Sequence, residues 1–156
     1  KSPVIEKTIY KSCLIKKKFV EKDEKEKGLR KVLNLGHTFA HAYESSFNYS
    51  RNLNHGEAVL LGIMTAIKFS FDIKLIKKKD FDLIKKHLQK SEIKIQLKKF
   101  FSNRDLEKII NFMKTDKKNT SKKINLVLLK KISKPVYNIN FDHIKLKAFL
   151  RRELNN

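Results

Sequence analysis

Apolar residues recur at helical spacing along most of this chain, and this pattern predicts its principal elements. The segment over 56–71 is apolar nearly all round, which is typical of a helix that is buried on most sides. The predicted helices cover residues 4–20, 29–47, 56–71 and 80–89, a segment led by a capping box at Ser102–Asp105, and a last segment capped by Asp142.

Core positions follow from the same spacing. The helix over 29–47 is expected to bury Leu29, Val32, Leu33, Leu35, Phe39, Ala42 and Tyr43. The helix after the capping box is expected to bury Leu106, Ile109, Ile110 and Met113, and the last helix Ile144, Leu146, Phe149 and Leu150.

One region alternates with a period of two. Ile124, Leu126 and Leu128 lie on one face of this stretch, and a second short apolar run follows at 136–139. The pair predicts a small β-hairpin. Because no repeat or linker divides the chain, we expect a single mainly α domain over 1–156 with one β-hairpin.

Composition narrows the class of protein. Lys and Arg number 37 against 16 acidic residues, a net charge of +21, but only five of the cations are Arg. Lys, Asn, Ile and Phe are abundant together and share AT-rich codons, so codon bias accounts for the charge. The single Cys13 excludes an internal disulfide framework and favours a reducing, cytoplasmic location. No run reaches the ~18 apolar residues of a membrane span, and we expect neither a membrane nor a nucleic-acid partner.

A polar stripe crosses the predicted helix over 29–47. Its members are Arg30, Asn34, His37, His41 and Glu44, at successive spacings of 4, 3, 4 and 3. Residues at these spacings share one helix face, which is either a solvated face or the wall of a site. In a chain whose bases are mostly Lys, ligand-handling groups such as Arg, Asn and His favour the wall of a site.

Three histidines suggest metal binding. His37 and His41 are four residues apart, a spacing that allows two imidazoles to reach one ion. His55 stands just before the apolar third helix and adds a third candidate ligand. The remaining two, His87 and His143, lie in Lys-rich surroundings and are interpreted as structural or exposed.

Two long motifs carry a resemblance. KGLRKVLNLGHTFAHAYE at 27–44 and LNHGEAVLLGIMTA at 53–66 closely resemble the C-terminal domain of the 3-dehydroquinate synthase family, and the segments 19–30 and 113–129 extend the likeness to almost the whole chain. The resemblance implies the helical C-terminal domain of that fold. It also implies conversion of 3-deoxy-arabino-heptulosonate 7-phosphate to 3-dehydroquinate and phosphate, the second step of the shikimate pathway, with catalytic NAD, a divalent metal (usually zinc, with cobalt as an alternative) and a homodimer.

The resemblance also assigns roles to individual residues. It implies that His37 and His55 bind the metal with an upstream Glu, and that His41 is an acid/base residue, which replaces the pairing of His37 with His41. Glu57 is interpreted as structural or as a brace for His55. The implied substrate-binding residues are Lys16, Arg30, Asn34 and Lys117, with Lys118 as the alternate to Lys117 and with Lys16 and Glu26 also catalytic.

The sequence contains no glycine-rich G-x-G-x-x-G turn for a dinucleotide. We therefore expect the NAD-binding α/β domain to lie outside this chain, which would be inactive alone and would begin partway through a longer protein. Three alternatives stay open: another sugar-phosphate cyclase of the same superfamily, a basic helical nucleic-acid-binding module, or a non-catalytic remnant. The dispersed charge and low Arg content weigh against the nucleic-acid module, and the intact polar stripe weighs against the remnant.

Overall fold

The computed structural model describes residues 3–48, 52–91, 96–115 and 123–155, and it divides into two compact units, Lys1–Asn34 and Leu35–Asn156. The first unit contains α1 (Pro3–Lys22) and the 3₁₀ helix η1 (Leu29–Asn34). The second contains α2 (His37–Ser46), α3 (His55–Asp72), α4 (Lys78–Lys90), η2 (Leu97–Lys99), η3 (Asn103–Asp105), α5 (Leu106–Thr115), β1 (Lys123–Lys131), β2 (Lys134–Asp142) and α6 (His143–Asn155). The predicted class, mainly helical with one hairpin, is confirmed.

The first unit begins with the predicted N-terminal helix. α1 buries none of its residues. Val4, Ile5 and Ile9, which gave the helical spacing, are between 58% and 67% exposed. The contacts within the first unit therefore leave its apolar residues exposed.

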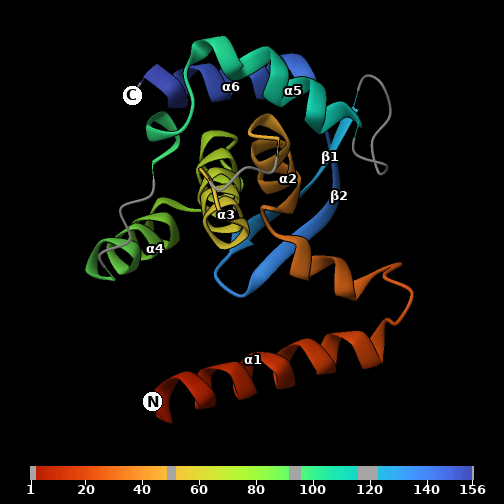
Figure 1. Cartoon of the computed structure of the whole chain (residues 1–156). Helices are drawn as coiled ribbons and strands as arrows, with labels where there is room; N and C mark the ends of the chain where they lie inside the picture. Colours follow the sequence, from red (N-terminus) through yellow and green to blue (C-terminus); the bar gives the residue numbers. More distant parts are fainter. Residues whose placement is uncertain (1–2, 49–51, 92–95, 116–122, 156) are drawn as a thin grey trace. The chain divides into compact units, whose positions relative to one another are not determined.

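The core of the second unit lies between α2 and α3, and α5 and α6 cross one end of this pair (Figure 1). Phe39 and Tyr43 of α2 are fully buried, and Tyr43 donates a hydrogen bond to Thr65 of α3 (3.0 Å). Burial raises the pKa of Tyr43 well above its usual range, so its hydroxyl stays protonated. The predicted core positions of α5 and, on α6, Leu146, Phe149 and Leu150 are buried; Ile144 is 66% exposed, so its assignment to the core is wrong.

The hairpin joins this core through β1. The strands pair antiparallel, with Ile124 opposite Phe141 and Leu126 opposite Ile139. Ile124, Leu126 and Leu128 are buried, as their alternation predicts. The buried hydroxyl of Ser70 on α3 accepts a hydrogen bond from the Leu129 N–H (3.1 Å), which ties the strand to the helix.

The prediction of one continuous helix over 29–47 is wrong. It divides into η1 and α2 at Gly36, whose φ of 79° lies in the left-handed region that favours glycine. A Cβ on Gly36 would lie 2.3 Å from the backbone nitrogen of Ile63, so only glycine fits against α3. Arg30 and Asn34 therefore lie outside the helix that carries His37, and Leu29, expected in the core, is 43% exposed.

Among the described residues, no helix is long and apolar enough to cross a membrane.

Candidate functional site

The first turns of α2 bring His37 and His41 together. Their ring centroids are 5.8 Å apart in an edge-to-face arrangement. The Nδ1 atom of His37 lies 3.5 Å from the carbonyl oxygen of Leu35, in the turn that leads into the helix. This contact fits a ring whose Nδ1 atom faces its own backbone.

His55 is the first residue of α3, and its ring contacts Glu44 of α2. The Nδ1 atom of His55 lies 2.9 Å from the Oε1 atom of Glu44. The Glu44 side chain is only 11% exposed, whereas the His55 side chain is 68% exposed. A carboxylate accepts hydrogen bonds, so the imidazole donates from Nδ1.

Glu57 is interpreted from sequence either as structural or as a brace for His55, and in the structure it has a structural role. Its Oε2 atom accepts a hydrogen bond from the backbone N–H of Asn54 (3.0 Å), in a capping box at the start of α3. The residue in contact with His55 is Glu44, which the sequence pattern placed only in the polar stripe. The signal in the sequence is its position, seven residues after His37 on the helix face that also carries His41.

Three predicted substrate-binding or catalytic residues gather in the first unit. Asn34 donates a hydrogen bond from Nδ2 to the Oε1 atom of Glu26 (2.5 Å). The Nε atom of Arg30 lies 4.0 Å from the Oε2 atom of Glu26, and its guanidinium donates to the carbonyl of Glu24 (2.7 Å). The carboxylate of Glu26 thus links Arg30 and Asn34, and Glu26 itself has a left-handed φ of 52°.

Asp23 organises the loop beneath this cluster, a role that the sequence pattern did not reveal. Its carboxylate accepts hydrogen bonds from the backbone N–H groups of Arg30 (3.0 Å), Gly28 (2.7 Å) and Lys27 (2.9 Å). These bonds, led by those from Arg30 and Gly28, lower the pKa of Asp23 below its usual range. An ionised Asp23 therefore holds Arg30 at the start of η1.

The other predicted lysines do not join either group. Lys16 is exposed on α1, and its side chain makes no hydrogen bond or ion pair with the described residues. Lys117 and Lys118 lie outside the described residues. In the described part of the chain, no three or more His, Cys, Asp or Glu residues lie together in a group that could hold a metal ion.

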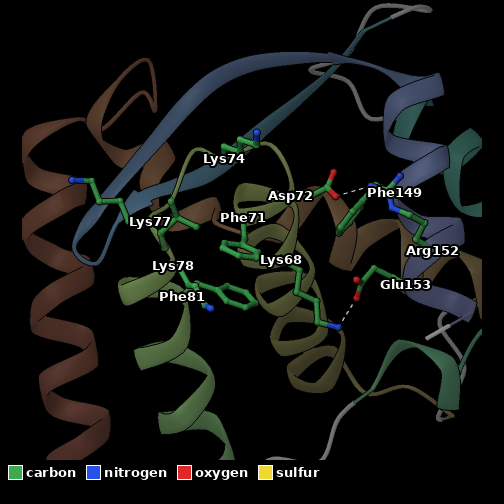
Figure 2. Close-up of a pocket in the computed structure, with 11 residues that line it drawn as sticks. Lys68, Phe71, Asp72, Lys74, Lys77, Lys78, Phe81, Phe149, Arg152 and Glu153 are labelled. Atoms are coloured by element: carbon green, nitrogen blue, oxygen red, sulfur yellow. Dashed lines mark hydrogen bonds and ion pairs between the residues drawn. The ribbon is translucent and has the colours of Figure 1, made fainter.

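A groove of about 740 Å³ lies elsewhere on the second unit, between α3, α4 and α6 (Figure 2). Phe71 and Phe81 stack in it with ring centroids 4.3 Å apart. Ion pairs of Asp72 with Arg152 (2.6 Å) and of Lys68 with Glu153 lie at its α6 side. None of the predicted site residues lines this groove.

Comparison with known proteins adds independent evidence. A family model described as 3-dehydroquinate synthase C-terminal matches residues 1–119. The 3-dehydroquinate synthase of Pelagibacter ubique (strain HTCC1062) is 54% identical over 154 residues, which cover 99% of this chain and 42% of that protein. The 3-dehydroquinate synthase of Endomicrobium trichonymphae is 39% identical over 141 residues, which cover 90% of this chain and 37% of that protein. The chain thus spans less than half the length of these relatives.

A solved structure shows the same fold. The crystal structure of 2-deoxy-scyllo-inosose synthase, complexed with carbaglucose-6-phosphate, NAD+ and Co2+, is similar with a TM-score of 0.62 and 23% sequence identity. The likeness covers 81% of this chain and 35% of that chain. At this identity the comparison supports the fold alone.

Proposed function

Because this chain belongs to the 3-dehydroquinate synthase C-terminal family, we propose that it is the metal- and substrate-binding part of a 3-dehydroquinate synthase. The complete enzyme would convert 3-deoxy-D-arabino-heptulosonate 7-phosphate to 3-dehydroquinate and phosphate, with NAD and a divalent metal, zinc or cobalt, as cofactors. The observation that carries this proposal is 54% identity to the Pelagibacter ubique synthase over 99% of the chain.

In this proposal His37 and His55 bind the metal, and a Glu from another part of the protein completes the set. Neutral imidazole is a suitable ligand for zinc, and the contacts of both Nδ1 atoms, with Leu35 and Glu44, support coordination through Nε2. When bound through these residues, such a metal would supply Lewis-acid chemistry that lowers the pKa of a substrate hydroxyl, and NAD would supply hydride chemistry.

The chain's own residues then handle protons and the anionic groups of the substrate. His41 is exposed beside His37, and we assign it the acid/base role because an imidazole changes protonation near neutral pH. The guanidinium of Arg30 gives one N–H to Glu24 and retains further donors for a substrate carboxylate. Asn34 would bind a hydroxyl, and Glu26, which accepts from Asn34, would act as the nearby catalytic carboxylate.

Lys16 and Lys117 complete the substrate-binding set in this proposal, with Lys16 also catalytic and Lys118 as the alternate to Lys117. Their cationic side chains suit the phosphate and carboxylate of a sugar phosphate. Assignment of these residues rests on the family motif, and each is tested by substitution to Ala in the phosphate-release assay described below.

The proposal also includes parts beyond the described chain. We propose an α/β NAD-binding domain in the same polypeptide, a homodimer and a cytoplasmic location. The exposed apolar residues of α1, including Val4, Ile5 and Ile9, support the packing of this helix against a further protein surface such as that domain. In the alternative, a sister sugar-phosphate cyclase would use the same metal and NAD chemistry on another sugar phosphate.

The decisive experiment measures phosphate release from the heptulosonate phosphate with NAD and zinc present. It uses this chain joined to, or co-expressed with, the upstream half of its polypeptide. We expect activity that vanishes in His55→Ala and collapses in His41→Ala. The matched control is His87→Ala, a histidine on the exposed face of α4, which should leave the rate unchanged. A folded, zinc-loaded protein without phosphate release would contradict the proposal and favour a sister cyclase.

A further inference from the structure

We infer that Glu44 is a positioning residue: its carboxylate holds the Nδ1–H group of His55 and so presents the Nε2 atom of that ring outward. The metal-binding consequence of this contact rests on the function proposed above. The contact itself is a property of the chain and can be measured without any metal.

The first support is the burial of Glu44. This side chain lies in the last turns of α2, next to the fully buried Tyr43, and the whole residue is 8% exposed. A buried carboxylate without a partner is strongly destabilising, so such groups are retained with partners. The partner present here is the His55 ring, at 2.9 Å.

The second support is that little else restrains the His55 ring. Its side chain is 68% exposed, and among the described residues Glu44 is its hydrogen-bond partner. The backbone at this point is held separately, because Glu57 accepts the N–H of Asn54 in the capping box. One carboxylate thus holds the start of α3, and another holds the imidazole that projects from it.

The third support is the placement of Glu44 on α2. Glu44 follows His37 by seven residues, about two helical turns, and His41 lies between them at the spacing of one face. The same face of one helix therefore carries His37, His41 and the group that orients His55. The close backbone contact of Gly36 with Gly62 sets the distance between α2 and α3, and so the reach from Glu44 to His55.

The chemical consequence is a choice of tautomer. A neutral imidazole carries its proton on either Nδ1 or Nε2, and a carboxylate at Nδ1 favours the proton there. The lone pair is then on Nε2, the ring nitrogen that does not contact Glu44. Loss of such outer partners typically weakens metal affinity 10- to 100-fold in other proteins.

The test begins with the metal-free protein. Long-range ¹H–¹⁵N NMR spectra of the imidazole nitrogens, recorded about two pH units above the ordinary histidine pKa of about 6.5, report the tautomer directly. We expect His55 to carry its proton on Nδ1 in the unmodified chain and to lose this preference in Glu44→Ala. Glu44→Gln, which keeps an oxygen acceptor, should retain part of it, and the matched control Glu57→Gln should leave it unchanged. Circular dichroism checks that each variant is folded.

The second measurement is zinc affinity, determined by competition with a chelator in the protein that includes the upstream half. Glu44→Ala should bind zinc 10- to 100-fold more weakly, and Glu57→Gln should bind it as the unmodified protein does. An unchanged tautomer in folded Glu44→Ala, or an unchanged zinc affinity, overturns the inference. If the tautomer responds to Glu44 but the unmodified protein binds no zinc, the metal part of the proposed function fails while the positioning contact stands.

Discussion

The packing of α2 on α3 depends on two glycines that face each other, and Gly62→Ala tests this contact. A Cβ on Gly62 would lie 2.3 Å from the carbonyl oxygen of Gly36 and 2.9 Å from the backbone nitrogen of Ala40. Both obstacles are backbone atoms, so a change of rotamer cannot relieve the clash. The helices would have to separate by about 1 Å to restore an ordinary contact, which lies at 3.4–4 Å.

Two opposing terms set the magnitude. Overpacking of a well-filled core costs about 3 kcal/mol when no side chain can yield. Alanine in place of glycine in a helix interior contributes about 1 kcal/mol in the stabilising direction. We therefore expect Gly62→Ala to lower the free energy of unfolding by about 2 kcal/mol. Gly36→Ala should lower it further, since its φ of 79° adds left-handed strain of about 1–2 kcal/mol.

The assay is equilibrium unfolding in urea, followed by circular dichroism. With a slope of about 2 kcal/mol per molar urea, the midpoint of Gly62→Ala should fall by about 1 M. The matched control is Gly56→Ala in the first turn of the same helix, where an added Cβ meets nothing within 4 Å. Its midpoint should stay the same or rise slightly, because only the helix-propensity gain remains. If Gly62→Ala proves as stable as Gly56→Ala, the close backbone contact between α2 and α3 does not exist.

Two further predictions concern single polar side chains. Backbone hydrogen bonds, led by the one from Arg30, lower the pKa of Asp23. The ionised carboxylate therefore holds the loop at neutral pH, and this hold is lost as the pH falls through the lowered pKa. NMR should show the Arg30 amide titrating below pH 3.8, and Asp23→Asn should abolish the titration. Ser70→Ala removes the acceptor for the buried Leu129 N–H and should destabilise the chain by about 1–3 kcal/mol in urea unfolding. The control is Ser91→Ala, whose exposed hydroxyl donates to the carbonyl of His87 in the preceding helix, and it should change stability by less than about 0.5 kcal/mol. Equal effects would show that the hydrogen bond between Ser70 and Leu129 contributes nothing.

Local sequence patterns predicted most of the helices and strands of this fold. Helical spacing identified α3, α4 and the α5 core, the capping box was recognised at Ser102–Asp105, and the period of two identified the hairpin. Each of these signals lies within one continuous stretch of the chain, because capping and periodic burial act between near neighbours in the sequence. The family motifs likewise lie in continuous runs, and the match to the family over residues 1–119 confirms the resemblance.

Within the candidate site, sequence reasoning proposed the residues but misjudged part of their arrangement. Arg30 and Asn34 have the spacing of the polar stripe in the sequence. In the structure they lie on η1, outside α2, and contact Glu26. The roles of His37, His41 and His55 stay predictions until substitutions are measured. The role of Asp23 was missed, and Glu44 was placed in the polar stripe without its partner His55, because a carboxylate in a sequence does not disclose the residue it contacts.

Elements, caps and candidate ligands were thus accessible from the order of the residues, since each depends on interactions between near neighbours along the chain. Tertiary packing decided where the helix breaks and which carboxylate meets which histidine. Gly36 takes its left-handed conformation against a backbone 26 residues away, and Glu44 reaches His55 because that contact fixes the spacing of α2 and α3. Contacts of this kind depend on close packing between elements distant in sequence, which no local pattern specifies.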